Sequence, residues 1–337
     1  MSDILNESAE AVELSSGVHS LPDQEFARDV SRGLSGSPKY LFSKYFYDEK
    51  GDELFQQIME LEEYYLTRAE YSIFDNQKEE ILKTFQGVGK SKFDLLEFGA
   101  GDGYKTKVLL RHFLDQKANF KYKPVDISSN VLETMSEELK KEMPELNTSG
   151  LRGDYFQVLE GLKKNSDKRR VVLFLGSNIG NFTKATATKF LHQLKNGLAP
   201  GDLVMIGFDL KKDPSKILLA YNDSKGITRD FNLNLLTRIN NELGADFDIN
   251  NFIHYPYYDP DIGECRSYLI SKCQHTVRIR NLEQDVYFKA WEPIHMEIST
   301  KFGLDDVQLL ADNAGFKIEA NFFDENKWFV DSVWRVV

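Results

Sequence analysis

The feature that most restricts the fold is a glycine-rich segment directly after a compact apolar run. Phe93–Phe98 has the pattern of a buried strand, and Gly99, Gly101 and Gly103 follow it before an apolar helical pattern around 107–110. Glycine permits left-handed backbone conformations and lets a ligand approach the backbone closely. A strand, a glycine turn and a helix in this order are typical of the first unit of a nucleotide-binding α/β fold.

The alternation of strands and helices continues beyond this turn. Further strands are expected at 121–127, 151–152, 170–175 and 203–208, with helices at 131–141 and through Phe190 and Leu194. This spacing predicts a parallel sheet with helices on both faces. Near the C-terminus, a helix at 305–314 precedes two strands at 317–323 and 329–335. These two strands predict an antiparallel hairpin at the edge of the sheet.

Two parts of the chain lack this alternation and indicate a second domain. Residues 1–80 have a polar start, with a short strand near 12–19, and then helical apolar stripes. Residues 212–296 contain a polar helix over 231–244 and extended segments at 264–271 and 275–279. We therefore predict an α/β protein. Residues 81–211 and 297–337 form a Rossmann-like core, residues 212–296 form an inserted α+β substrate domain, and residues 1–80 add a helical cap to it.

Composition argues against several classes of function. The 42 Lys and Arg against 53 Asp and Glu give a net charge of −11, which disfavours nucleic-acid binding. Two cysteines, Cys265 and Cys273, and six scattered histidines give neither a disulfide framework nor metal-ligand spacing. No signal-peptide pattern and no apolar run of ~20 residues is present. We expect a cytoplasmic protein without a metal or a membrane partner.

The glycine spacing distinguishes between two kinds of nucleotide cofactor. A dinucleotide fold requires Gly-x-Gly-x-x-Gly, so that a pyrophosphate can lie at the helix N-terminus. Here the third glycine is one position early, and Glu97 and Asp102 would repel a pyrophosphate. A sulfonium nucleotide has no phosphate, and its amino acid tail carries an ammonium group that suits nearby carboxylates. The turn therefore favours S-adenosylmethionine over a dinucleotide.

The ends of the next two strands carry further candidates for cofactor binding. Asp126 ends the second strand, where its carboxylate can accept hydrogen bonds from ribose hydroxyls. Gly153, Asp154 and Tyr155 follow the third strand. We expect this segment to receive the adenine, with Asp154 accepting a hydrogen bond from the adenine amino group.

Several long motifs are similar to those of one methyltransferase family. They are LFLGSNIGNF at 173–182, DLKKDP at 209–214, AYND at 220–223, GIT at 226–228, FNLN at 231–234, EISTKF at 297–302 and much of 46–70. The chain resembles the histidine-specific Nα-methyltransferases of ergothioneine biosynthesis, whose fungal relatives methylate tryptophan-like amines. The resemblance extends from about Leu41 to the C-terminus. It implies a Rossmann-like methyltransferase sheet with an inserted substrate domain.

The resemblance also implies roles for individual residues. Asn181, Tyr64 and Tyr221 would hold the ammonium and carboxylate groups of an amino acid, with the Gly176 backbone near the amine; Asn181 and Tyr64 are the catalytic candidates. Glu297 and Ser299 would face the substrate side chain. Ser267 aligns with a position that is methionine in typical members acting on histidine, which leaves the side-chain pocket open to other substrates. On the cofactor side, the implied residues are Tyr47, Gly99, Lys105, Asp126, Asp154 and Tyr155, and the glycine turn adds Gly101.

Each of these residues also has a purely structural interpretation. Asn181 could cap a helix, Tyr64 and Tyr221 could be core aromatics with bonded hydroxyls, and Glu297 lies in an apolar-polar alternation whose polar members are usually solvated. The resemblance favours the functional interpretation in each case.

The predicted activity is S-adenosylmethionine-dependent methylation of the α-nitrogen of a free amino acid. L-Histidine is the first candidate, converted stepwise to a trimethylammonium betaine with S-adenosylhomocysteine as the second product. One alternative is another aromatic amino acid or amine, such as a tryptophan-like one. A different class of alternative is a non-catalytic regulator that binds an amino acid or S-adenosylmethionine. An NAD-dependent oxidoreductase is disfavoured by the glycine spacing. We expect a monomer.

Overall fold

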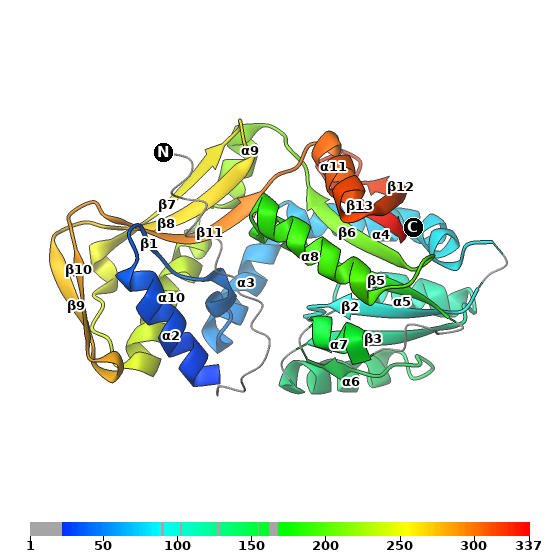
Figure 1. Ribbon diagram of the computed structural model, residues 1–337, viewed down its shortest axis with the longest axis horizontal. Helices are drawn as coiled ribbons and strands as arrows, with labels where there is room; N and C mark the ends of the chain where they lie inside the picture. Colours follow the sequence, from blue (N-terminus) through cyan, green and yellow to red (C-terminus); the bar gives the residue numbers. More distant parts are fainter. Residues whose placement is uncertain (1–21, 89–90, 102, 127–128, 154, 162–167) are drawn as a thin grey trace. The chain divides into compact units, whose positions relative to one another are not determined.

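The computed structural model describes residues 22–88, 91–101, 103–126, 129–153, 155–161 and 168–337 (Figure 1). The chain divides into two compact units. Unit 1 contains residues 1–65 and 212–300, and unit 2 contains residues 66–211 and 301–337. The strand expected near 12–19 lies outside the described residues.

The unit boundaries differ from the expected ones at 80 and 296. Residues 66–80 belong to unit 2 because they form the first part of helix α4 (Leu66–Gln86), which is kinked at Gln77. Ile73 and Phe74 lie in the same buried cluster as Ile81 and Phe85 from the end of this helix. The aromatic residues of 42–65 and those of α4 therefore serve two separate cores.

Unit 2 is built on one seven-stranded sheet in the order β12-β13-β6-β5-β2-β3-β4. The strands are β2 (Phe93–Phe98), β3 (Phe120–Asp126), β4 (Leu151–Arg152), β5 (Arg169–Phe174), β6 (Leu203–Asp209), β12 (Phe316–Phe323) and β13 (Phe329–Val336). Strands β2 to β6 are parallel, whereas β13 pairs antiparallel with both β6 and β12. The predicted parallel sheet with an antiparallel hairpin at its edge is confirmed.

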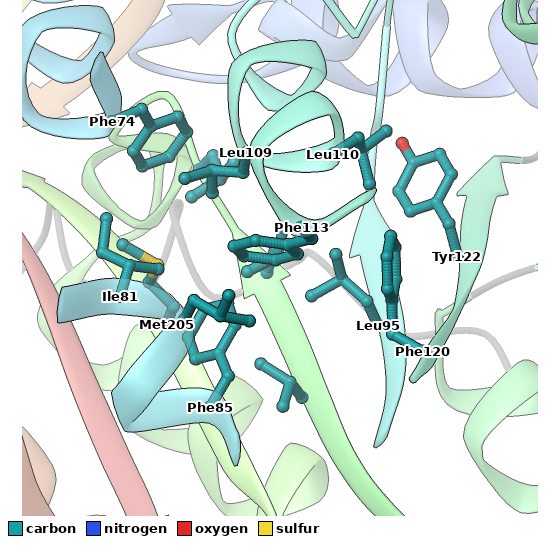
Figure 2. Close-up of a cluster of buried hydrophobic side chains, with 14 of the residues drawn as sticks. Phe74, Ile81, Phe85, Leu95, Leu109, Leu110, Phe113, Phe120, Tyr122 and Met205 are labelled. Carbon is teal, nitrogen blue, oxygen red and sulfur yellow. The ribbon is translucent and has the colours of Figure 1, made fainter. Parts of the chain in front are cut away.

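Helices cover both faces of this sheet. On one face, α4, α5 (Thr106–Asp115) and α6 (Ser129–Glu142) contribute to a single buried cluster with strand residues. Figure 2 shows Phe85 of α4 and Phe113 of α5 in this cluster with Leu95, Phe120 and Met205 from the strands. On the other face, α7 (Tyr155–Gly161), α8 (Lys184–Gly197) and α11 (Leu304–Ala314) contribute to a second cluster. The sheet is buried on both faces, which accounts for its nearly continuous apolar strands.

Unit 1 has an α+β structure of its own. Its four-stranded sheet has the order β1-β11-β8-β7, and a separate hairpin pairs β9 with β10. The strands are β1 (Lys39–Tyr40), β7 (Phe252–Asp259), β8 (Glu264–Ser271), β9 (His275–Ile279), β10 (Gln284–Phe288) and β11 (Pro293–Thr300). The helices are α2 (Pro22–Ser35), α3 (Glu49–Glu60), α9 (Pro214–Ala220) and α10 (Ile227–Leu243), with short 3-10 turns η1 (Ser43–Phe46), η3 (Ile249–Asn251) and η4 (Arg280–Leu282).

The core of unit 1 lies between α10 and one face of the larger sheet. Phe231, Leu235 and Ile239 of α10 are buried in one cluster with Leu269 of β8 and Ile294 of β11. Strand β8 alternates between buried and half-buried residues, as a strand with one covered face does. Within the described part of the chain, no helix is both long and apolar enough to cross a bilayer.

A buried carboxyl fixes the geometry at the end of β2. The carboxylate of Glu97 accepts hydrogen bonds from Thr106 Oγ1 and from the Tyr122 hydroxyl, each at 2.6 Å. Glu97 thereby connects β2 to the start of α5 and to β3. Burial raises the pKa of Glu97 to about 7, although both hydroxyl donors act in the opposite direction.

Replacement of Asp202 tests a buried ion pair of unit 2. Arg170 in β5 donates from Nε to Asp202 Oδ2 at 2.8 Å, and both side chains are buried. Asp202→Ala leaves the guanidinium uncompensated, so we expect a loss of about 3–5 kcal/mol in the free energy of unfolding by urea. Glu319→Ala is the control because it breaks an ion pair with Arg335 that is 41% and 42% exposed. Its expected loss is under about 1 kcal/mol, and equal losses would contradict the prediction.

The raised pKa of Glu97 predicts a specific pH dependence of stability. The unfolded carboxyl titrates near 4.5 and the folded one near 7. The contribution of Glu97 to the free energy of unfolding is therefore complete below pH 4.5 and is lost as pH rises through about 7. The shift corresponds to about 3 kcal/mol. Melting temperatures of the wild type and Glu97→Gln, measured from pH 5 to pH 8, should show the wild type losing stability relative to the variant. Parallel curves of melting temperature against pH for the two proteins would contradict the prediction.

Candidate active site

The glycine turn of unit 2 has a backbone that other residues could adopt only with strain. Gly99, Gly101 and Gly103 have φ values of +65°, +55° and +64°, in the left-handed region. A Cβ on Gly99 would lie 3.0 Å from the Tyr155 hydroxyl, whereas a Cβ on Gly101 would meet no atom within 4 Å. The turn therefore offers uncovered backbone between β2 and α5. Asp102 lies outside the described residues.

Most of the residues expected on the cofactor side lie at one edge of the unit 2 sheet. Gly99 follows β2, Asp126 ends β3 and Tyr155 begins α7 after β4. Parallel strands end at the same edge, which is where doubly wound folds bind ligands. The Tyr155 ring stacks on Phe98 at the end of β2, with centroids 4.5 Å apart and planes 1° from parallel. Asp154, expected to meet the adenine, lies outside the described residues.

One expectation about this turn is corrected. Glu97 was expected to present a carboxylate to a ligand beside the glycines, but it is only 4% exposed and both of its oxygens bond to hydroxyls inside unit 2. Its position in β2 points it inward, towards Thr106 and Tyr122. Glu97 therefore supports the turn, and its burial keeps the carboxyl group away from a ligand at the surface of the turn.

Lys105 is bound by a residue that the sequence analysis missed. Glu70 of α4 is fully buried, and it forms an ion pair with Lys105 Nζ and accepts a hydrogen bond from the Gly176 backbone N–H at 2.8 Å. Burial lowers the pKa of Lys105, but the adjacent Glu70 carboxylate outweighs this and the pKa is raised. The sequence does contain a signal for Glu70. It lies three positions before Ile73 and four before Phe74, which places a glutamate on the apolar face of a helix.

Asn181 lies in a turn at the same edge of the sheet. It is the last residue of the 3-10 helix η2 (Asn178–Asn181), which follows β5 after left-handed residues at Gly176 and Ser177. The helix that follows, α8, is capped by Thr183, whose hydroxyl accepts from the Thr186 N–H at 3.2 Å. Asn181 is therefore not the cap of α8, and the structural interpretation considered for it is wrong.

Unit 1 brings together four of the residues expected to contact a substrate. Ser267 of β8 lies directly opposite Glu297 of β11, so their side chains are neighbours on one sheet face. Ser299 is two residues further along β11 and shares this face. The Tyr221 hydroxyl at the end of α9 donates to Ser299 Oγ at 2.7 Å, and both residues are buried. This polar group, called here the Glu297 patch, consists of Tyr221, Ser267, Glu297 and Ser299.

Aromatic residues of the N-terminal segment form a second cluster in unit 1. Tyr47 contacts the rings of Phe55 and Phe231, with centroids 5.4 and 5.7 Å away, and Phe55 in turn contacts Tyr64 at 6.4 Å. Desolvation of the hydroxyl and the nearby carboxylates of Glu297 and Asp52 raise the pKa of Tyr47. The structure therefore places Tyr47 in unit 1, in the same aromatic cluster as Tyr64, and its expected role on the cofactor side stays a prediction.

The arrangement supports two kinds of ligand recognition. Unit 2 presents bare glycine backbone, a charged lysine and a carboxylate at strand ends, which suits a nucleoside with an amino acid tail. Unit 1 presents a carboxylate and hydroxyls beside aromatic rings, which suits a small polar ring or amine. Among the described residues, no group of three or more His, Cys, Asp or Glu side chains is placed to hold a metal ion.

Comparisons with known proteins agree with this chemistry. Residues 26–336 match the family described as histidine-specific methyltransferase, SAM-dependent. The chain is 34% identical over 304 residues to the histidine N-alpha-methyltransferase of Mycolicibacterium smegmatis, covering 90% of both chains. It is 35% identical to the protein of the same name from Mycobacterium tuberculosis, covering 82% of this chain and 84% of the relative.

A eukaryotic relative extends the comparison. Ergothioneine biosynthesis protein 1 of Schizosaccharomyces pombe is 29% identical, over 83% of this chain and 37% of its own length. The family match covers nearly the whole chain, through both units, and includes every residue of the expected site. The chain therefore belongs to the family of S-adenosylmethionine-dependent, histidine-specific methyltransferases.

Proposed function

We propose that this protein methylates the α-amine of free L-histidine, using S-adenosylmethionine. The observation that carries the proposal is the identity of 34% and 35% to two proteins named histidine N-alpha-methyltransferase. The Glu297 patch supports the choice of side chain. The carboxylate can accept a hydrogen bond from one ring nitrogen of an imidazole while one of the three neighbouring hydroxyls bonds to the other nitrogen, whereas an indole offers a single N–H donor.

The cofactor assignment is supported by the residues at the edge of the unit 2 sheet. In this proposal the glycine turn receives the amino acid tail, Lys105 binds its carboxylate, and Asp126 accepts from the ribose hydroxyls. Tyr155, with Asp154, contacts the adenine. When bound, S-adenosylmethionine supplies an electrophilic methyl group on a sulfonium sulfur, and S-adenosylhomocysteine remains after transfer.

Recognition of the amino acid backbone groups is assigned to four residues. Tyr64 and Tyr221 carry phenols that can bind a carboxylate or an ammonium group without adding net charge. Asn181 and the Gly176 backbone are assigned to the amine. An amide contact is weak enough to let the amine rotate between transfers, which a stepwise reaction requires. Asn181 and Tyr64 are therefore the proposed catalytic residues.

The chemistry requires a neutral amine, since an ammonium group has no lone pair. The proton must leave before the nitrogen attacks the methyl carbon; the N–C bond forms as the S–C bond breaks, and the bonding electron pair returns to sulfur. Desolvation of an amine lowers its pKa, and water can accept the proton. The contribution of the protein is alignment of the two reactants. We propose three successive transfers, which yield the trimethylammonium betaine.

Mass spectrometry of the reaction products tests the proposed activity directly. Incubation of the protein with S-adenosylmethionine and L-histidine should give a ladder of mono-, di- and trimethylhistidine, with matching release of S-adenosylhomocysteine. L-Tryptophan and other free amino acids serve as competing substrates in separate reactions. A single methyl addition would overturn stepwise methylation. No turnover with any amino acid would instead favour the non-catalytic regulator.

Replacement of Glu297 tests the recognition of the substrate side chain. Glu297→Ala removes a charged acceptor, and hydrogen bonds to charged groups contribute about 1.5–3 kcal/mol, so kcat/KM for histidine should fall about 10- to 100-fold. The control is Asp285→Ala, which removes an exposed carboxylate from β10 in the same unit and should leave kcat/KM unchanged. Preferred turnover of tryptophan by the wild type, with little effect of Glu297→Ala, would show that the pocket reads a different ring.

A further inference from the structure

Two carboxyl groups from different elements are buried together in unit 2. Glu70 of α4 and Asp331 of β13 are both fully buried. Asp331 lies directly opposite Gly207 in the pairing of β13 with β6. A Cβ on Gly207 would lie 2.5 Å from Glu70 Oε1, so the carboxylate of Glu70 occupies the space that any side chain at this position would need. Glu70 and Asp331 therefore meet at one point of the sheet.

The hydrogen bonds of the two carboxyls are unequal. Glu70 accepts from the Gly176 N–H and pairs with Lys105 Nζ. Neither oxygen of Asp331 receives a hydrogen bond from a donor in the described part of the chain. An ionised carboxylate without donors is costly to bury. A protonated Asp331 avoids this cost and can donate its O–H to Glu70.

The electrostatics of the cluster also favour a protonated Asp331. Burial and the adjacent Glu70 carboxylate raise the pKa of Asp331 well above its usual value, and the opposing effect of Lys105 is smaller. With Asp331 protonated, the cluster holds one negative charge on Glu70 and one positive charge on Lys105. With Asp331 ionised, the cluster would carry a net negative charge behind the lysine.

We propose that Glu70 and Asp331 are positioning residues that share one proton, fix Lys105 beside Gly176 and keep the cluster neutral, so that Lys105 can bind the carboxylate of the cofactor's amino acid tail. The ligand part of this inference rests on the proposed cofactor. Lys105 is 21% exposed, and an ammonium group has three N–H donors, so it can pair with Glu70 and still reach a ligand. Loss of the shared proton places a like charge near the ligand carboxylate and weakens binding.

Other ionisable groups lie near Glu70 and Asp331, and their effects on ligand binding must be distinguished from those of the pair. Glu97 on β2 interacts with both Lys105 and Glu70, and its pKa of about 7 lies inside the working range. Asp209, two residues after Gly207 on β6, is paired with Lys301 at 2.8 Å, and both are fully buried. These groups are the same in the wild type and in Asp331→Asn. Differences between the two proteins therefore report on Asp331.

Infrared spectroscopy of the ligand-free protein tests the shared proton without using the cofactor. At pH 7 the C=O band of protonated carboxyl groups should be more intense in the wild type than in Asp331→Asn, which keeps only the contribution of other protonated carboxyls such as Glu97. The control is Asp312→Asn, which changes an exposed carboxyl of α11 and should leave the band intact. A band of equal intensity in Asp331→Asn would overturn the assignment of the proton.

The binding of S-adenosylhomocysteine, measured by calorimetry from pH 7 to pH 9.5, tests the consequence. Asp331→Asn keeps an N–H donor for Glu70 and cannot ionise, so its Kd at pH 7 should lie within about threefold of the wild type. As pH rises, the wild type should weaken by at least about tenfold more than the variant, which is the effect of one nearby like charge. Identical pH profiles would overturn the role of Asp331.

Glu70→Gln distinguishes positioning from simple packing. Glutamine fills the same space and can still accept from the Gly176 N–H, but it removes the charge that holds Lys105. The Kd for S-adenosylhomocysteine at pH 7 should rise at least about tenfold. An unchanged Kd would overturn the role of Glu70. Failure of the wild type to bind S-adenosylhomocysteine would reject the proposed cofactor, and the infrared result would still decide whether the pair shares a proton.

Discussion

The geometry of unit 2 at the carboxyl ends of its parallel strands depends on one buried carboxylate, that of Glu70. Glu70 bonds to the backbone after β5 and to Lys105 before α5, and it lies against Gly207 of β6. A helix, a turn and two strands are thus joined by a single side chain. The arrangement requires a glycine at 207, because a Cβ there would occupy the same space as the carboxylate. It also explains why α4 belongs to unit 2, although it follows the N-terminal segment in sequence.

The parallel sheet could be predicted because its strands are buried on both faces. Continuous apolar runs such as 170–175 separated by amphipathic helices have few other structural solutions. The edge hairpin was predictable for a related reason, since two apolar strands are separated by only a short polar turn. The glycine turn was equally clear, because three left-handed positions leave glycine as the ordinary choice. In these regions local pattern and tertiary structure agree.

The sequence was less informative where a polar residue serves a buried network. In the sequence, Glu97 has the pattern of a ligand-binding carboxylate, but its role in the structure is to support the fold. Only its hydrogen bonds from the Thr106 and Tyr122 hydroxyls show this. Glu70 and Asp331 are more than 250 positions apart, so no local pattern connects them. The Glu297 patch depends on the register of β8 against β11, and β11 was not predicted as a strand. Cross-strand partners of this kind are set by tertiary pairing.

The buried acids of unit 2 show why Asp331 stands apart. Asp202 pairs with Arg170, Asp209 with Lys301 and Glu70 with Lys105, while Glu97 accepts from two hydroxyls and Asp324 from three backbone N–H groups. Each of these has a donor that justifies its burial. Asp331 receives no hydrogen bond from a donor in the described part of the chain, and the adjacent Glu70 carboxylate acts on it more strongly than Lys105 does. A carboxyl group in that setting is compatible with a stable fold when it is protonated. A protonated carboxyl group beside a carboxylate can then donate a hydrogen bond to it.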